Sequence, residues 1–118
     1  MGGRLDHLLA NALVLTSERW RDMRVSARFG PARLWVVRTE VELHGDPGEI
    51  VSLVPVGGAA EGVVSRGLAY RLVGERLEPS SATGLSNALL GNVATVGLSQ
   101  GVLLAILPGE RADPDSLP

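Results

Sequence analysis

The segment TEVELHGDPG (residues 39–48) is the clearest structural signal in this sequence. In its first half, Glu40, Glu42 and His44 alternate with Thr, Val and Leu, and this alternation is typical of a half-buried β-strand. Its second half, Gly-Asp-Pro-Gly, predicts a tight turn, and the apolar residues 50–56 that follow predict a buried strand. We therefore expect antiparallel strands joined by short turns. The Glu, Glu and His side chains should lie on a solvated strand face and form no metal site.

Similar short apolar runs lie on both sides of this segment. Upstream, residues 25–29 alternate in the same way, and a Gly-Pro turn separates them from a long strand that begins at Leu34 and runs through residue 44. Residues 79–92 are rich in Ser, Gly and Asn and are expected to form a loop. So many short strands predict a mainly β fold, an antiparallel β-sandwich. The remaining strands are expected downstream, the last two as a hairpin, at residues 62–65, 68–72, 75–78, 93–98 and 102–107.

The amino-terminal residues follow a different period. Over residues 5–17, Leu and Ala recur at helical intervals, which predicts one amphipathic helix with Asp6 at its cap or in its first turn. The chain then divides into a helical segment over residues 1–21, a sandwich over residues 22–109 and a polar tail over residues 110–118. We expect this Pro-containing tail to be disordered.

The composition excludes several classes of chemistry. With 118 residues, 45% of them hydrophobic, the chain suits one packed domain. It has no cysteine, which excludes disulfides and thiolate chemistry, and all 11 basic residues are Arg, which excludes a catalytic or phosphate-binding Lys. The net charge is -2, no apolar run is long enough for a bilayer, and the amino terminus has no signal-peptide layout. We expect a cytoplasmic protein without nucleic-acid or membrane partners.

Two polar segments could bind a ligand, and the first is GGRLDH (residues 2–7), just before the helix. Its glycines permit close approach, and the helix N-terminus and Arg4 suit a phosphate. Asp6 could hold Mg²⁺, and His7 could donate to a phosphate oxygen. The alternative is a plain helix cap at Asp6 with solvated Arg and His side chains.

The second polar segment is SSATGLSN (residues 80–87). It places hydroxyl and amide groups around a glycine, and such groups form directional hydrogen bonds to a polar heterocycle. The alternative is that these residues are ordinary turn formers. Tyr70, one of four aromatic residues, could stack on a flat or cationic ligand, or could pack on the sheet with its hydroxyl in water.

Five short motifs occur in order along the chain: GGRLDHLLAN at residues 2–11, SLVPV at 52–56, GLAYRL at 67–72, GLSN at 84–87 and GVLL at 101–104. Together they resemble the motifs of the thiamine pyrophosphokinase (thiamine diphosphokinase) family. The resemblance implies an enzyme that transfers pyrophosphate from ATP to thiamine, giving thiamine diphosphate and AMP, and that acts as a homodimer with thiamine near the interface. It also implies an α/β nucleotide-binding domain followed by a β-sandwich. This chain would then be the carboxyl-terminal part, with its helix left from the nucleotide-binding domain.

On the nucleotide side, the resemblance implies that Arg4 and Asp6 are catalytic, that Arg4 and His7 bind ATP and that Asp6 holds Mg²⁺. Transfer of pyrophosphate needs a metal and positioned charge around the transferring group. One carboxylate and one Arg supply too little of either. We therefore expect the chain to need the family's nucleotide-binding half for catalysis.

On the thiamine side, the resemblance implies that Ser86 and Asn87 contact thiamine, that Ser81 is a further contact and that Tyr70 lies near the pocket. Two alternatives to an enzyme remain. One is a module that binds thiamine without catalysis, and the other is a dimerisation domain in which the Ser/Asn loop is only a turn.

Overall fold

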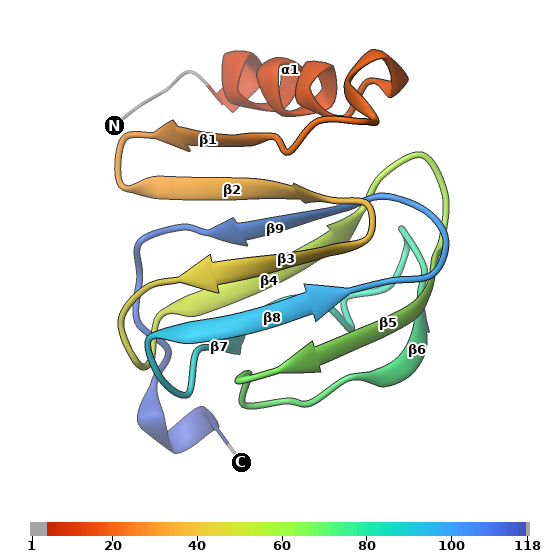
Figure 1. Cartoon of the computed structure of the whole chain (residues 1–118). Helices are drawn as coiled ribbons and strands as arrows, with labels where there is room; N and C mark the ends of the chain where they lie inside the picture. Colours follow the sequence, from red (N-terminus) through yellow and green to blue (C-terminus); the bar gives the residue numbers. More distant parts are fainter. Residues whose placement is uncertain (1–4, 118) are drawn as a thin grey trace.

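The elements of the fold are seen in a computed structural model that describes residues 5–117 (Figure 1). Helical structure is confined to the two ends of this range, and strands fill the part between. The elements are α1 (Leu5–Leu15), η1 (Glu18–Trp20), β1 (Ser26–Phe29), β2 (Ala32–Val37), β3 (Glu40–His44), β4 (Ile50–Pro55), β5 (Ala60–Arg66), β6 (Val73–Leu77), β7 (Asn87–Ala88), β8 (Val93–Gly97), β9 (Leu103–Leu107) and η2 (Pro114–Ser116).

The strands form two antiparallel sheets that pack face to face. The five-stranded sheet has the order β1-β2-β9-β4-β7, and the four-stranded sheet has the order β3-β8-β5-β6. In Figure 1 the sheet with β3 and β8 lies in front of the sheet with β9 and β4, and α1 lies beside β1 at the top. The predicted antiparallel β-sandwich with one amino-terminal α-helix is confirmed.

The core lies between the two sheets and follows from the alternation of apolar residues along the strands. Burying one Leu or Val side chain stabilises the fold by about 1.5–3 kcal/mol, so this layer supplies most of the stabilisation. Its largest fully buried side chains come from both sheets and the connections between them: Leu43, Leu53, Leu77, Leu89, Leu103, Leu107, Val37, Val51, Val63 and Val96.

The long strand expected from Leu34 to residue 44 is in fact two strands that lie in different sheets. β2 pairs with β9, whereas β3 pairs with β8, and the chain crosses between the sheets at Arg38 and Thr39. The alternation could not reveal this crossing because Val37 and Leu43 face the same core from opposite sheets. The expected hairpin of β8 and β9 is wrong for the same reason, since β8 pairs with β3 and β5 and β9 pairs with β2 and β4.

Residues 68–72, expected to be a strand, have no regular pairing. Leu68 makes an isolated bridge with Leu89, and the next strand, β6, begins only at Val73. Gly67 has a φ of +85° and lies against the backbone of Ala94, so the chain turns sharply where the expected strand would begin.

The carboxyl-terminal tail, expected to be disordered, pairs with the start of β4 as far as it is described. The Ile50 N–H donates to the Glu110 carbonyl at 2.8 Å, and the Ala112 N–H donates to the Gly48 carbonyl at 2.8 Å. The polar composition suggested disorder. Composition does not show, however, that backbone groups in the turn before β4 are available to pair with the tail.

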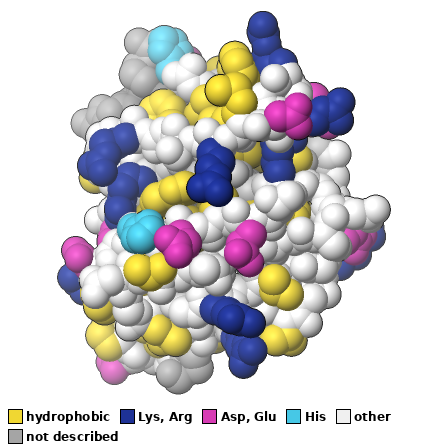
Figure 2. Space-filling view, viewed as in Figure 1, with side chains coloured by type: hydrophobic (Ala, Val, Ile, Leu, Met, Phe, Trp, Pro, Cys, Tyr) yellow, Lys and Arg dark blue, Asp and Glu magenta, His cyan; other side chains and the backbone are white. Residues whose placement is uncertain are grey.

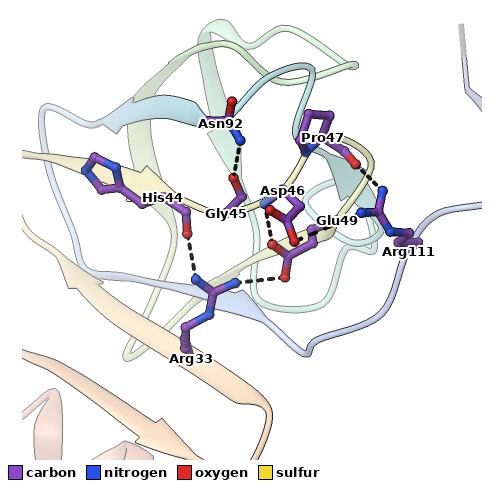
Figure 3. A network of polar contacts seen from close by, with 8 residues as sticks. All are labelled: Arg33, His44, Gly45, Asp46, Pro47, Glu49, Asn92 and Arg111. Carbon is purple, nitrogen blue, oxygen red and sulfur yellow. Dashed lines mark hydrogen bonds and ion pairs between the residues drawn. The ribbon is translucent and has the colours of Figure 1, made fainter.

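A polar network fixes the turn between β3 and β4 (Figure 3). The Glu49 carboxylate accepts hydrogen bonds from the Asp46 N–H at 2.5 Å and from the Arg33 guanidinium at 2.7 Å. Arg33 also donates to the His44 carbonyl at 2.7 Å. Burial acts to raise the pKa of Glu49, but the bonds from Asp46 and Arg33 and the charges of Arg33 and Arg111 together lower it. Glu49 is therefore held as a carboxylate that anchors the turn.

The outer face of the five-stranded sheet is uncharged along its strands, and α1 packs on one part of it. The helix contributes the buried Ala12 and the half-buried Leu15, while Leu9, Leu13 and Val14 remain more than half exposed. No helix in residues 5–117 has the length and apolar character needed to cross a membrane. The outer face consists of Val25, Ala27, Phe29, Leu34, Val36, Ile50, Ser52, Val54, Val56, Val102, Leu104 and Ile106.

Arg38 ties the end of α1 to the crossing between the sheets. Its guanidinium donates to the carbonyls of Thr16 at 2.8 Å and Ser17 at 2.9 Å. It also donates to the Glu18 carboxylate at 2.8 Å. The carbonyls at the end of a helix lack partners within the helix, so a cation is favourable there.

Candidate functional site

The first candidate segment lies at the start of α1. Arg4 lies outside the described residues. Asp6 and His7 are in the first turn of the helix, with exposed side chains and 4.0 Å between Asp6 Oδ2 and His7 Nε2. Among residues 5–117 no three His, Asp or Glu side chains are grouped to hold a metal ion. The described part of this segment therefore offers one exposed carboxylate.

The second candidate segment belongs to the loop that joins β6 to β7. The Leu53 N–H donates to the Gly84 carbonyl at 2.7 Å, which attaches the loop to β4. A Cβ atom at Gly84 would overlap the Leu53 carbonyl oxygen, so only glycine permits this close approach. The loop is docked on the edge of the sheet at this point.

Ser86 has an unusual backbone conformation and an exposed side chain. Its φ is +60°, and it is the only non-glycine residue in the described part of the chain with a positive φ. This left-handed conformation costs a non-glycine residue about 1–2 kcal/mol. The Ser86 N–H donates to the Ser52 hydroxyl at 3.1 Å, which helps to hold the conformation. The Ser86 hydroxyl is thus presented to solvent beside the outer face of the sheet.

Asn87, the next residue, is buried and connects the loop to Tyr70. Its Oδ1 accepts from the Tyr70 N–H at 2.9 Å and from the Ala88 N–H at 2.9 Å. Its Nδ2 donates to the Tyr70 carbonyl at 2.7 Å. The structure thus brings together two separately predicted candidates, Tyr70 and the Ser86-Asn87 pair. The Tyr70 side chain is 47% exposed.

Ser81 lies at the other end of the loop and is exposed. Its hydroxyl is 2.6 Å from the Thr83 hydroxyl and accepts from the Thr83 N–H at 3.1 Å. These bonds form a small turn, and the Ser81 N–H closes a second turn by donating to the Glu78 carbonyl at 3.0 Å. Ser81 therefore shapes the loop through its own neighbours.

Ser52 is a residue that sequence reasoning missed. The motif SLVPV was considered only as a strand, although Ser52 is the one polar residue within the apolar stretch IVSLVPV. Its neighbours Val51 and Leu53 are in the core, so Ser52 is on the outer face, where its hydroxyl meets the Ser86 N–H. A single hydroxyl in an otherwise apolar strand was the available signal.

The described part of the first candidate segment and the loop of the second lie at opposite edges of the five-stranded sheet. α1 is beside β1 at one edge, and the loop leads into β7 at the other edge (Figure 1). Neighbouring strands are about 4.8 Å apart, so the edges are separated by roughly 19 Å. One copy of the chain therefore does not bring Asp6 and Ser86 into a common site.

Two cavities have no lining residue from either segment. The larger, of about 750 Å³, lies between β3 and the residues before β1 and combines Arg24 and Arg38 with the acidic side of β3. The smaller, of about 480 Å³, lies over β5 and β8. Glu40, Glu42 and His44 border the larger cavity and are exposed, which confirms the predicted solvated strand face. Figure 2 shows a histidine and acidic side chains in a row across the middle of this face.

The structure is an antiparallel β-sandwich with a polar loop docked on the edge of its larger sheet. The family described as "Thiamin pyrophosphokinase, vitamin B1 binding domain" matches residues 38–103, which is more than half of the chain. The chain therefore belongs to the thiamin pyrophosphokinase family. The resemblance seen in the sequence motifs is confirmed.

Solved structures of similar fold carry the same family name. The thiamine pyrophosphokinase from Bacillus subtilis is 20% identical, with a TM-score of 0.79 over 93% of this chain and 53% of that one. The thiamin pyrophosphokinase from Geobacillus thermodenitrificans is 26% identical, with a TM-score of 0.71 over 98% of this chain and 52% of that one. The chain thus spans about half the length of these proteins. No curated protein sequence matches it.

Proposed function

We propose that this chain is the thiamine-binding part of an enzyme that transfers pyrophosphate from ATP to thiamine, giving thiamine diphosphate and AMP. Membership of the thiamin pyrophosphokinase family supports this activity. The observation that carries the proposal is the docked loop, which presents Ser86 beside Ser52 and is joined to Tyr70 through Asn87. Because the reaction consumes ATP, we also propose a cytoplasmic location.

The thiamine contacts come from this loop and from Tyr70. The exposed Ser86 hydroxyl can donate and accept hydrogen bonds, which suits the polar edge of an aminopyrimidine ring. The aromatic face of Tyr70 attracts a positively charged ring such as the thiazolium of thiamine. Ser81, on the same loop, supplies a further polar contact.

The nucleotide and the metal are assigned to the amino-terminal segment. Arg4 and His7 contact ATP in this proposal, and Arg4 and Asp6 act in catalysis. Mg²⁺ commonly takes one or two carboxylates together with substrate phosphates and water. The described residues supply one such carboxylate, Asp6, and do not complete a magnesium centre by themselves. The remaining ligands and the rest of the ATP site are expected from the family's nucleotide-binding half.

A second copy of the chain is the proposed partner of the uncharged outer face. This face carries half-buried apolar side chains such as Phe29, Val54 and Ile106, which gain from further burial. A two-fold axis parallel to the strands would place β1 of one copy over β7 of its partner. Such a homodimer brings the two candidate segments, which lie at opposite edges in one copy, toward each other.

Titration calorimetry with thiamine tests the proposed binding site. We expect Ser86→Ala to weaken thiamine binding by about tenfold, the loss of one hydrogen bond. The matched control is Ser80→Ala, which removes an exposed hydroxyl from the same loop and should leave the affinity unchanged. A wild-type chain that is folded by circular dichroism and does not bind thiamine would refute the proposal, as would equal affinities of wild type and Ser86→Ala.

An assay of thiamine diphosphate formation tests whether the chain needs the family's nucleotide-binding half for catalysis. The chain alone, with ATP, Mg²⁺ and thiamine, should form no product, because it offers one carboxylate at the nucleotide side. Addition of the family's nucleotide-binding half should produce turnover. Product formed by the chain alone would contradict the need for that half.

A non-catalytic module is the second candidate function. It is favoured by the described residues at the nucleotide side, which offer one exposed carboxylate and no group of side chains that could hold a metal ion. A module of this kind would bind thiamine but form no thiamine diphosphate even when the nucleotide-binding half is supplied. A pure dimerisation domain would not bind thiamine at all.

A further inference from the structure

Asn87 is buried, although the loop that contains it is exposed. Its side chain is 5% exposed, whereas Ser86 beside it is open to solvent. Its carboxamide forms three hydrogen bonds within the chain, two at Oδ1 and one at Nδ2. A carboxamide can accept two and donate two. At most one N–H of Asn87 therefore remains for any other partner.

These hydrogen bonds join Asn87 to the backbone of Tyr70, which lies outside any regular strand. The segment around Tyr70 runs beside β7, where the Ala69 N–H donates to the Ala88 carbonyl at 2.9 Å, but it forms no regular strand. A carboxamide has the same donor and acceptor as a peptide group. Asn87 thus bonds to both the N–H and the carbonyl of Tyr70.

We propose that Asn87 is a positioning residue: it fixes the backbone of Tyr70 against the end of the loop and so places the Tyr70 ring for thiamine, without touching thiamine itself. The proposal rests on the proposed function for the identity of the ligand and for Tyr70 as a contact. It differs from the role that family resemblance implied, in which Asn87 is a thiamine contact. Ser86 is held independently, through Ser52 and the docked Gly84.

A double-mutant cycle separates positioning from direct contact. Asn87→Ala should weaken thiamine binding by about tenfold in the wild-type background but by less than about twofold in the Tyr70→Ala background, because the ring to be positioned is gone. Additive effects of the two substitutions would overturn the proposal, since they indicate a separate contact with thiamine. The matched control is Asn92→Ala, which removes an amide bonded to the Gly45 carbonyl and should not change the affinity.

Hydrogen exchange at the Tyr70 amide provides a measurement that needs no ligand. In Asn87→Ala this amide should exchange at least about tenfold faster, while the amide of Val96 in the core keeps its protection. Where Asn87→Ala does not fold, Asn87→Asp serves instead: it keeps the acceptor toward the Tyr70 N–H and loses the donor to the Tyr70 carbonyl. We expect this variant to have an intermediate exchange rate and an intermediate affinity.

The outcomes distinguish failure of this inference from failure of the proposed function. A folded wild-type chain that does not bind thiamine refutes the proposed function and, with it, any role of Asn87 in thiamine binding. Unchanged exchange of the Tyr70 amide in the Asn87 variants overturns the positioning role, whatever the chain binds. Faster exchange with an unchanged thiamine affinity also overturns it, because the bonds would then be structural only.

Discussion

Replacement of Arg38 by alanine should release α1 from the sandwich while the sandwich stays folded. The Arg38 side chain is 15% exposed, and its guanidinium holds the end of the helix through the carbonyls of Thr16 and Ser17. The apolar packing of α1 is small by comparison, since it buries Ala12 and part of Leu15. Arg38 is therefore expected to supply much of the free energy that docks the helix.

The magnitude follows from the three hydrogen bonds of the guanidinium. A hydrogen bond to a charged group contributes about 1.5–3 kcal/mol, but water replaces part of this at half-exposed carbonyls. The ion pair with Glu18, whose side chain is 75% exposed, adds about 0–1 kcal/mol. We expect a loss of about 2–3 kcal/mol in the docking of α1. A helix of 11 residues is not stable alone, so this loss should unfold it.

Hydrogen exchange over residues 5–17, together with circular dichroism, measures this effect. In Arg38→Ala, exchange in α1 should approach that of an unfolded segment while β4 and β9 keep their protection. Arg38→Lys keeps the charge but has no planar fork and should be intermediate. Arg28→Ala, at an exposed site on β1, is the control and should change stability by less than about 0.5 kcal/mol. Wild-type protection of α1 in Arg38→Ala would refute the reasoning.

Four further changes test other parts of the structure. The pKa of Glu49 is lowered in the folded chain, so its carboxylate stabilises the fold above about pH 4.5 and this stabilisation is lost as the pH falls through the lowered value. Glu49→Gln should therefore lose stability at neutral pH and show a weaker acid dependence in urea unfolding. Leu53→Ala, in the core, should cost about 2–5 kcal/mol in the same assay. Gly84→Ala should displace the loop, lower the melting temperature by an overpacking cost of about 1–3 kcal/mol and abolish thiamine binding in calorimetry. Ile106→Arg places a charge on the uncharged outer face and should shift the proposed dimer to monomer in sedimentation velocity.

The sequence was sufficient to predict the helix and most of the strands but not how the strands pair. The alternation of Glu40, Glu42 and His44 correctly indicated an exposed strand face, and Leu spacing correctly indicated α1. The break at Arg38 was invisible because alternation records which side of a strand is buried and not which sheet the strand joins. Pairing of β2 with β9 links residues far apart in the chain, which no local pattern encodes.

For the candidate site, the sequence indicated which residue types could bind a ligand. The structure showed which contacts these residues make within the chain. The segment around Ser86 and Asn87 was found from its hydroxyl and amide groups and from family resemblance. The roles that the structure gives to Ser52 and Gly84 depend on contacts across the sheet edge and are set by packing. The prediction of a strand at residues 68–72 was wrong, and within this segment the backbone of Tyr70 bonds to the side chain of Asn87.

The central place of β9 in the five-stranded sheet sets the order in which the protein can fold during its synthesis. β9 joins β2 to β4, and it is the last strand of the chain. Until it is made, β2 and β4 each have one unpaired edge that invites association with other chains. A nascent polypeptide that ends before Leu103 would therefore expose both of these edges to association with other chains.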